Sequence, residues 1–350
     1  MGEKIKIVFF DTKNYDKEIF DKANEQYKYN IEYLETKLNI ISADLVKGAY
    51  AVCIFVNDKV DADVIEKLVR NNIKLVILRC AGYNNIELKA AFEKIHVARV
   101  SAYSPNAIAE HTIALLLTLT RNIHKAYNRV REGNFLLNGL VGRNLYEKTA
   151  GIIGTGKIGK ITAEILLGFG MNVVAYDKFP SETWASEKNV EYMDLETLCK
   201  QSDVISLHSP LTKDTYHLIN EHLLSLMKKD VCIVNTGRGA LIDTRSLINA
   251  LKKKCIGGAA LDVYEEEELY FFEDKSLSAI EDDVLARLLT FPNVIITGHQ
   301  AFLTNEALKA IAETSLGNVR DFVEKNIIPN EICYYCEKNN CIKETLKRCW

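Results

Sequence analysis

The sequence lacks any long apolar run, which excludes a membrane-spanning helix. Its longest run, from Ile113 to Leu119, is interrupted by Thr118 and is far shorter than the roughly 20 residues that cross a bilayer. The N-terminal stretch MGEKIKIVFFD leads directly into a strand-like pattern, without the long apolar core of a secretory signal peptide. We therefore expect a cytoplasmic protein with no membrane partner.

The sequence also lacks an excess of charge of either sign. Its 44 Lys and Arg residues nearly balance its 47 Asp and Glu residues, and the formal net charge is −3. Binding to nucleic acid or to an anionic membrane surface usually rests on a basic patch or stripe. The composition gives no electrostatic reason for such a partner, so we expect no nucleic acid.

Metal-ligand spacings are scarce. Most of the seven histidines stand far apart in the sequence, so a metal hydrolase has little support and we expect no catalytic metal. Four cysteines, however, crowd the last 18 residues: Cys333, Cys336, Cys341 and Cys349. They contain one C-x-x-C pair but no second, so zinc is weakly supported. We interpret residues 333–350 as an extension with no role in catalysis.

The other five cysteines stand among apolar strand or helix residues. Without a secretory signal, reduced thiols are the expected state. Each is interpreted as a small buried hydrophobe: Cys53, Cys80, Cys199, Cys232 and Cys255.

A length of 350 residues, 48% of them apolar, suits two domains with separate cores. The first hundred residues alternate between strand and helix patterns, which predicts a parallel sheet covered by helices on both faces. Strands are predicted at 4–10, 29–34, 51–56, 74–80 and 96–100, and helices at 15–27, 42–48, 61–71 and from 87.

A helix that is apolar nearly all round follows, from Ile108 to Leu119. Such a helix is buried on most sides. It could link two domains or form a subunit interface, and the sequence does not separate these possibilities.

The stretch from Thr149 to Asp177, TAGIIGTGKIGKITAEILLGFGMNVVAYD, has the pattern of a dinucleotide-binding motif. An apolar strand runs into Gly154, Gly156 and Gly159, a helix pattern follows, and a second strand ends on an acid. The alternative is an ordinary turn between strand and helix, but strand, helix and acid are all in the required order.

Each residue of this motif has a physical role. Gly154 allows the tight turn, Gly156 lets the backbone approach a pyrophosphate at the positive end of the helix, and Gly159 lets helix and strand pack closely. Asp177 can accept hydrogen bonds from a ribose diol and would repel a 2′-phosphate. We therefore expect NAD, preferred over NADP.

Four later strands, predicted at 203–208, 230–235, 258–263 and 292–297, each end in polar groups. The rule that places ligands at the carboxyl edge of a parallel sheet puts these groups beside the bound dinucleotide. They are Ser209 and Pro210, then Thr236 to Gly239, then Asp262 with Glu265 to Glu268, and finally Gly298 to Gln300.

Three of these groups could together reduce a 2-keto acid. Arg238 offers a planar fork of donors to a carboxylate, and His299 can carry a proton near neutral pH. An acid among Glu265 to Glu268 beside the histidine would favour the imidazolium and orient the ring. With nicotinamide as hydride carrier, the set would interconvert a 2-keto acid and a 2-hydroxy acid. Taken singly, each residue could equally be a solvated loop residue.

The chain resembles the D-2-hydroxyacid dehydrogenase family over about residues 4–332, and within it the bacterial fermentative D-lactate dehydrogenases. The resemblance rests on RCAGYNN, AYSPNAIAEH, GIIGTGKIG, VNTGRGALIDT, LDVYEEEELYFFEDKS and FPNVIITGHQAFLTNEAL, in this order. It implies a D (R) product, which nothing in composition or spacing shows. The chain departs from the family in its cysteine-rich end.

The resemblance also assigns roles to individual residues. It implies catalytic Arg238, His299 and Glu267, choosing one glutamate among four. On the cofactor it implies Lys157 and Ile158 beside the pyrophosphate, Ser209, Pro210 and Thr215 on the adenosine side, and Thr236, Gly237 and Asp262 toward the nicotinamide. On the substrate it implies Ala81 and Gly82 at the carboxylate, with Tyr103 and Phe302 closing the pocket.

The fold implied is α/β, with two Rossmann-like or flavodoxin-like domains, parallel sheets and an active site in the cleft between them. The substrate domain would comprise 1–101 and 300–332, and the NAD domain 102–299 would be inserted into it. The expected function is an NADH-dependent pyruvate reductase making D-lactate, with no metal, in a homo-oligomer such as a dimer or a dimer of dimers. Two alternatives stay open: a dehydrogenase for bulkier acids such as 2-ketoisocaproate or phenylpyruvate, and a non-enzymatic NAD-sensing protein that binds a partner.

Overall fold

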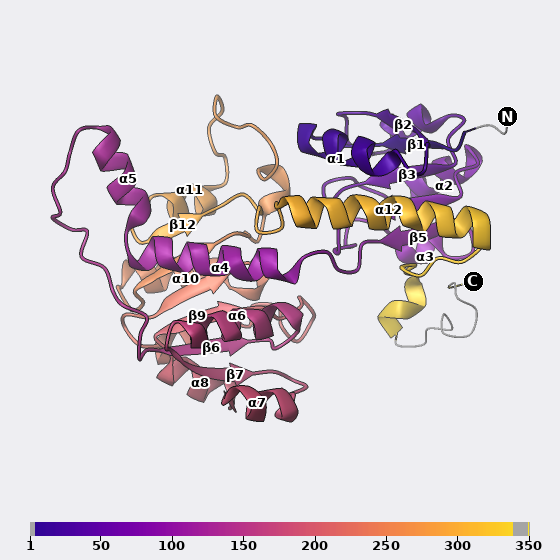
Figure 1. Ribbon diagram of the computed structural model, residues 1–350. Coiled ribbons are helices and arrows are strands. Elements are labelled where there is room, and N and C mark those ends of the chain that lie inside the picture. Colours follow the sequence, from indigo (N-terminus) through magenta and orange to yellow (C-terminus); the bar gives the residue numbers. More distant parts are fainter. Residues whose placement is uncertain (1–3, 339–348, 350) are drawn as a thin grey trace. The chain divides into compact units, whose positions relative to one another are not determined.

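The computed structural model describes residues 4–338 and 349 (Figure 1). The chain forms two compact units, one made of Met1–Ser104 with Leu303–Trp350 and the other of Pro105–Phe302. We call them the split unit and the inserted unit. Their junctions, 104/105 and 302/303, lie a few residues from those expected from the sequence, 101/102 and 299/300. No helix among the described residues is long and apolar enough to cross a membrane.

The split unit is built on a five-stranded parallel sheet of order β2-β1-β3-β4-β5. Its strands are β1 (Lys6–Phe9), β2 (Asn30–Tyr33), β3 (Ala51–Ile54), β4 (Leu75–Leu78) and β5 (His96–Arg99). Its helices are α1 (Asn14–Asn24), α2 (Ala62–Arg70), α3 (Leu88–Ala91) and α12 (Asn305–Lys325), with 3-10 turns η1 (Ser42–Val46) and η4 (Tyr334–Lys338).

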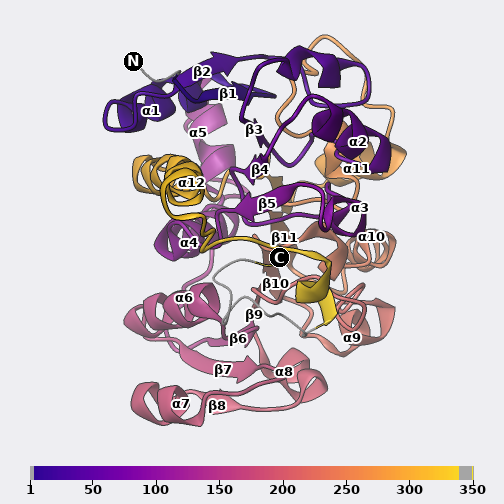
Figure 2. The ribbon, with the colours of Figure 1, turned by 90° about the vertical axis from the view of Figure 1, so that its right-hand side faces the viewer.

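Helices cover both faces of this sheet. Figure 2 shows α1 and α12 on one side of the strands and α2 and α3 on the other. In α2 the Asp61 side chain accepts a hydrogen bond from the Val64 amide and caps the helix, while Val64, Ile65 and Leu68 are buried. Burial of each such side chain contributes roughly 1.5–3 kcal/mol, so this apolar stripe fixes α2 on the sheet.

The inserted unit is built on a seven-stranded parallel sheet of order β12-β11-β10-β9-β6-β7-β8. Its strands are β6 (Thr149–Ile153), β7 (Asn172–Tyr176), β8 (Glu191–Tyr192), β9 (Val204–Leu207), β10 (Cys232–Asn235), β11 (Gly258–Leu261) and β12 (Val294–Ile296). Its helices are α4 (Pro105–Thr120), α5 (Ile123–Arg131), α6 (Lys157–Gly168), α7 (Glu182–Lys188), α8 (Leu195–Gln201), α9 (Glu221–Leu226), α10 (Thr244–Lys252) and α11 (Asp283–Leu289), with 3-10 turns η2 (Gly239–Leu241) and η3 (Glu267–Leu269).

Two apolar clusters lie on opposite faces of this sheet. Leu115 and Leu116 of α4 pack with Ala163 and Leu166 of α6 on one face. Residues of α8 to α11 fill the other, among them Leu198 of α8. Most of α4 is buried, as its apolar pattern predicts, and its contacts with β10 and β11 place it within the inserted unit.

The predicted parallel sheets of both units are confirmed, and the predicted strand boundaries differ from those observed by at most two residues. The sequence patterns did not distinguish the amphipathic helices α5 and α7 to α11 or the two-residue strand β8. One cysteine prediction is wrong. Cys53, Cys80, Cys199 and Cys232 are buried, but Cys255 is exposed because it follows the turn that ends α10.

Candidate active site

The glycine motif lies at the centre of the inserted unit's sheet, at the carboxyl end of β6. The chain proceeds from β6 to β7 on one side and later returns to β9 on the other, so this is the point where the strand order reverses. Ligands of open parallel sheets bind at this point. The groups that follow β7, β9, β10, β11 and β12 therefore share one edge with the glycine motif.

The three glycines of the motif are needed for different reasons. Gly154 has φ +94°, and a β-carbon on it would lie 2.6 Å from the Ser209 amide nitrogen. A β-carbon on Gly159 would lie 1.9 Å from the Gly154 carbonyl oxygen, so no side chain fits there. Gly156 has open space around it and directly precedes α6, with Lys157 and Ile158 at the helix start. This exposed backbone suits a pyrophosphate group.

Asp177 follows β7 at the same edge. One carboxylate oxygen accepts hydrogen bonds from the Thr155 amide and hydroxyl at 2.6 and 3.0 Å. The other accepts from the Phe179 amide at 2.9 Å. The motif loop thus holds the acid beside Gly156, in a half-buried position.

The loop after β9 is held by its own hydrogen bonds. The Thr215 hydroxyl donates to the Pro210 carbonyl at 2.6 Å and accepts from the Thr212 amide at 2.7 Å. Ser209 contacts the Gly154 turn, as its distance to a β-carbon there shows. All three residues that the resemblance places near the adenosine side, Ser209, Pro210 and Thr215, therefore belong to one loop next to the motif.

The loop after β10 carries Arg238. The Asn235 side chain accepts from the Gly237 amide at 3.0 Å and donates to the Arg238 carbonyl at 2.9 Å, which closes the loop. A β-carbon on Gly239 would lie 2.1 Å from the Tyr264 carbonyl carbon, so the loop packs directly on the backbone after β11. Arg238 is half-buried, and its guanidinium donates to the Gly237 carbonyl at 2.8 Å.

Two residues near Arg238's strand were predicted on the nicotinamide side. The buried Thr236 hydroxyl lies 2.8 Å from the hydroxyl of Thr112 on α4. A β-carbon on Gly237 would lie 3.4 Å from the Leu207 carbonyl oxygen, so the backbone at Gly237 lies close to the end of β9. Thr112 could have been suspected from the sequence, because a polar residue on an otherwise apolar helix often makes a buried hydrogen bond, here to Thr236.

His299 and Glu267 form the pair that the resemblance predicted. Nδ1 of His299 lies 2.7 Å from one Glu267 carboxylate oxygen, and the other oxygen accepts from the Tyr264 amide at 2.9 Å. Their side chains are 20% and 21% exposed. Glu265 is engaged elsewhere, 2.6 Å from Nε2 of His217 and 3.1 Å from the Thr244 hydroxyl. The glutamate in contact with His299 is therefore Glu267 and not Glu265, which spacing alone could not show.

Asp262 anchors the segment that carries His299. Its fully buried carboxylate accepts from the amides of Gln300 and Ala301 at 2.9 and 2.8 Å, and its carbonyl accepts from the His299 amide at 2.7 Å. His299 has φ +52°, a left-handed conformation that is costly for a histidine, and these bonds hold it. Asp262 thus lies at the edge of the sheet and also holds the loop that carries His299.

His111 of α4 joins this network and was missed from the sequence. Its Nε2 lies 3.3 Å from Asp262, and the Thr297 hydroxyl donates to the same carboxylate oxygen at 2.5 Å. Burial alone would raise the pKa of the Asp262 carboxyl, but hydrogen bonds from His111, Thr297 and the two backbone amides outweigh it, so the pKa is lowered. The carboxylate stays ionised and keeps all its hydrogen bonds at neutral pH.

The predicted substrate residues divide between the two units. Ala81, Gly82 and Tyr103 belong to the split unit, and the buried Phe302 is the last residue of the inserted unit. Ala81 and Gly82 follow β4 at the carboxyl edge of its sheet. The Arg99 guanidinium donates to the Ala81 carbonyl at 2.7 Å, which fixes the start of this loop.

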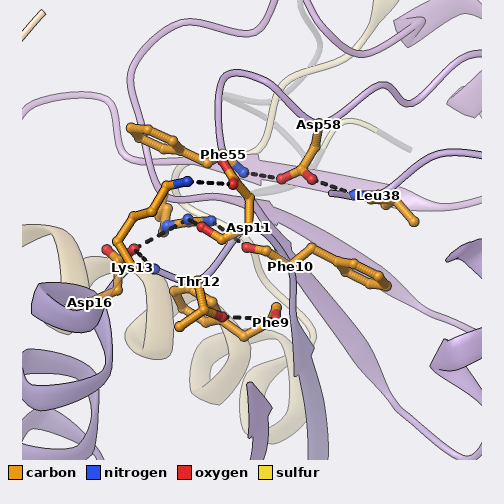
Figure 3. Close-up of polar contacts among 10 residues, drawn as sticks. Phe9, Phe10, Asp11, Thr12, Lys13, Asp16, Leu38, Phe55 and Asp58 are labelled. Atoms are coloured by element: carbon orange, nitrogen blue, oxygen red, sulfur yellow. Dashed lines mark hydrogen bonds and ion pairs between the residues drawn. The ribbon is translucent and has the colours of Figure 1, made fainter. Parts of the chain in front are cut away.

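A buried arginine supports the loop that carries Ala81 and Gly82. Arg79, two residues before Ala81, donates to the carbonyls of Phe10 and Asp11 at 3.1 and 2.6 Å and pairs with Asp16 at 3.3 Å. Figure 3 shows the surrounding polar contacts, in which Asp58 accepts from the amides of Leu38 and Phe55. The ends of β1, β3 and β4 are therefore tied together beneath the loop.

The edge of the inserted unit fits a dinucleotide and proton-transfer chemistry. Open backbone at Gly156 and the acid Asp177 lie at the β6 and β7 ends, and Arg238 with the Glu267–His299 pair lies at the β10 to β12 ends. Groups suited to cofactor recognition and groups suited to proton exchange thus lie along one edge of the sheet.

Comparison with known proteins agrees with this arrangement. Residues 113–301 match the family model described as "D-isomer specific 2-hydroxyacid dehydrogenase, NAD binding domain". The chain is 50% identical to the D-lactate dehydrogenase of Escherichia coli over 94% of this chain and 100% of that protein.

Solved structures show the same similarity. The apo-structure of the Escherichia coli D-lactate dehydrogenase has a TM-score of 0.87 and 47% identity, covering 94% of this chain and 100% of the other. The NAD-complexed D-isomer specific 2-hydroxyacid dehydrogenase of Lactobacillus delbrueckii has a TM-score of 0.79 and 30% identity, covering 93% and 99%. The chain therefore belongs to the D-isomer specific 2-hydroxyacid dehydrogenases, which are NAD-dependent oxidoreductases.

Proposed function

We propose that this chain is a D-lactate dehydrogenase that reduces pyruvate to D-lactate with NADH and also catalyses the reverse reaction. The observation that carries the proposal is the Glu267–His299 pair, at 2.7 Å, on the same sheet edge as Arg238 and the glycine motif. Relatives named D-lactate dehydrogenase support the choice of substrate.

Arg238 would bind the substrate carboxylate. One of the five N–H groups of a guanidinium is used in the bond to the Gly237 carbonyl, at 2.8 Å. The planar fork can then present two parallel donors to a carboxylate, or one to the carboxylate and one to the keto oxygen. A lysine in this place would keep the charge but lose that geometry.

His299 would exchange the proton. Because Glu267 holds Nδ1, the other ring nitrogen, Nε2, is the one left to face the substrate oxygen. In the direction of pyruvate reduction, the imidazolium gives its Nε2 proton to the keto oxygen as C2 becomes tetrahedral. In reverse, neutral His299 accepts the hydroxyl proton. The nicotinamide, when bound, supplies or accepts the hydride at C2.

The remaining contacts are assigned by the same proposal. Ala81 and Gly82 would hold the substrate carboxylate through their backbone, with Tyr103 and Phe302 closing the pocket. Thr236, Gly237 and Asp262 would face the nicotinamide side, and the loop that carries Ser209, Pro210 and Thr215 the adenosine side.

The test is a panel of 2-keto acids with chiral analysis of the products. We expect the highest kcat/KM with pyruvate and a D-lactate product. A preference for 2-ketoisocaproate or phenylpyruvate would replace the substrate but keep the reaction. An L product, or no turnover with any acid of the panel, would contradict the proposal.

We also propose that Asp177 makes NAD the preferred cofactor over NADP. Its carboxylate, held by Thr155 at 2.6 Å, would accept hydrogen bonds from a ribose diol and repel a 2′-phosphate. The Asp177→Ala variant should bind NADH more weakly and NADPH less so. An unchanged ratio of the two KM values would contradict this role.

Finally, we propose a homo-oligomer. α5 and the loop after it carry an exposed apolar surface, including Ile123, Tyr127 and Val130, which are 51%, 59% and 51% exposed, and Leu137. Patches of this kind often mark subunit contacts. Light scattering after gel filtration should give a mass of at least two chains, and Tyr127→Glu with Val130→Glu should reduce it to one.

A further inference from the structure

Three cysteine thiols gather beside the edge strand of the split unit. The Sγ atoms of Cys333, Cys336 and Cys349 all lie within 4.8 Å of one another. Within residues 4–338 and 349, no other group of three or more His, Cys, Asp or Glu side chains has a geometry that could hold a metal ion. We call this group the thiol cluster.

The start of the cluster is fixed to the sheet by backbone hydrogen bonds. The Arg99 amide donates to the Asn330 carbonyl at 3.1 Å, and the Ile332 amide donates to the Val97 carbonyl at 2.9 Å. Glu331 pairs with Ala98 in an antiparallel bridge between these bonds. Cys333, the next residue, therefore begins from a position set by the edge of β5.

Cys333 and Cys336 form a tight C-x-x-C turn. The Cys336 amide donates to the Cys333 carbonyl at 3.0 Å, and the Cys333 amide lies 3.4 Å from the Cys336 sulfur. The turn brings both thiols to one side, with the Cys333 amide directed at the Cys336 sulfur. This is the spacing and second layer of contacts that thiolate metal sites use.

Cys349 reaches the same place from thirteen residues beyond Cys336. Its amide donates to a Glu331 carboxylate oxygen, and the other oxygen of Glu331 lies 2.6 Å from Nδ1 of His96 on β5. Cys333 and Cys349 are 4% and 1% exposed, whereas Cys336 is half-buried. The cluster is thus a built site with one ligand open to solvent, through which an ion can enter.

We propose that the thiol cluster binds one Zn²⁺ through the three cysteine sulfurs. Soft thiolates select zinc over harder divalent ions. Tetrahedral Zn–S bonds of about 2.3 Å place neighbouring sulfurs roughly 3.8 Å apart, which the cluster reaches with small shifts. A disulfide needs two sulfurs at about 2 Å and an oxidant, and it would leave the third thiol out. Cys341 lies outside the described residues.

The bound ion would be structural. It would tie the segment after Glu331 to the edge of β5, and it would cover a strand edge that otherwise offers unpaired backbone groups. None of the three cysteines belongs to the proposed catalytic or cofactor contacts, so dehydrogenase activity should not depend on the metal.

The experiment is metal analysis of the full chain, purified under reducing conditions without chelator. Mass spectrometry of the metals should find about one zinc per chain, and each of Cys333→Ser, Cys336→Ser and Cys349→Ser should lose it. Cys255→Ser, at the exposed cysteine outside the cluster, is the matched control and should keep it. Copper in place of zinc, no metal, or zinc retained in all three variants would overturn the proposal.

Two further measurements keep the proposal testable if a variant folds poorly. Co²⁺ added to the metal-free parent should give thiolate-to-cobalt charge-transfer absorbance, and Zn²⁺ should abolish it. Zn²⁺ should also raise the Tm of the metal-free parent and of Cys255→Ser, but not that of Cys349→Ser. A disulfide among the three cysteines in protein kept anaerobic and metal-free, with no cobalt spectrum, would overturn the site.

Discussion

The two sheets of this protein use charged groups at their carboxyl edges in opposite ways. In the split unit, Arg79 is 1% exposed and its partner Asp16 5% exposed, so the charges face one another and not the solvent. In the inserted unit, the side chains of His299 and Glu267 are 20% and 21% exposed. The first edge is therefore a fixed support, and the second presents groups that can meet a ligand.

Physical chemistry explains the difference. A buried guanidinium is tolerated only when it is hydrogen-bonded and paired, and Arg79 meets two carbonyls, one carboxylate and the rings of Phe9 and Phe55, at 4.4 and 4.6 Å from its guanidinium carbon. Groups that exchange protons or bind substrate must keep some donors accessible.

The largest effect is expected at His299. His299→Asn removes the proposed proton donor, so kcat/KM for pyruvate should fall about 10²–10⁴-fold, with little change in stability. His217→Asn is the matched control, because His217 also pairs with a glutamate, Glu265, at 2.6 Å in the same unit. Steady-state assays at 340 nm check both. An equal loss of kcat/KM in the two variants would show that the His299–Glu267 pair has no role that the His217–Glu265 pair lacks.

At the other edge, Arg79→Met should act on stability first. The substitution leaves Asp16 buried without its cation, and breaking a buried pair costs about 3–5 kcal/mol. Urea unfolding followed by circular dichroism measures the loss. The double variant Arg79→Met with Asp16→Asn should recover part of it, because the uncompensated charge is gone. A single variant as stable as the parent would show that the Arg79 network is not a structural support.

The contrast between the edges also shows how far the sequence could predict the site. The strand ends can be predicted from local hydrophobic patterns, and the glycine motif from the spacing of its glycines. Together they identify the edge of the inserted unit's sheet where ligands bind. The choice of Glu267 came from family resemblance, because spacing treats Glu265 to Glu268 alike. In physical terms, Glu267 and Glu265 are separated by their contacts, with His299 for the first and His217 for the second.

Residues that act across the sequence were not predictable. His111 reaches Asp262 across 151 positions of the chain, and only the packing of α4 against β11 brings them together. The sequence around Arg79 predicts only the end of a strand beside Cys80. No neighbouring residue in the sequence indicates that Arg79 pairs with Asp16. The thiol cluster was not predictable for the same reason, because Cys349 comes close to Cys333 only through its contact with Glu331.

Glu267→Gln should have a smaller effect than loss of His299. The amide keeps the shape but removes the charge that holds Nδ1 of His299, and a hydrogen bond to a charged group is worth about 1.5–3 kcal/mol. We expect kcat/KM to fall roughly 10–150-fold, with a changed pH profile. Glu265→Gln should leave kcat/KM nearly unchanged, and a comparable loss there would argue against the selection of Glu267.

The smallest effect is expected at His208, a half-buried histidine at the inserted unit's edge, which tests whether a group there changes its protonation on folding. Burial lowers the pKa of His208 to about 4, and its Nε2 lies 2.8 Å from the Ser206 hydroxyl. The unfolded chain binds this proton near pH 6.5, so the native state binds fewer protons between these values. The resulting stability is present above pH 6.5 and is lost as the pH falls toward 4.

His208→Gln can keep a hydrogen bond to Ser206 but cannot titrate. Between pH 6.5 and 4, the free energy of unfolding of the parent should therefore fall by about 1–2 kcal/mol more than that of the variant. Urea unfolding at a series of pH values gives both curves. Parallel curves would mean that His208 is protonated as readily in the folded protein as in the unfolded chain. The side chains at this edge would then be open to solvent from Arg238 as far as the glycine motif.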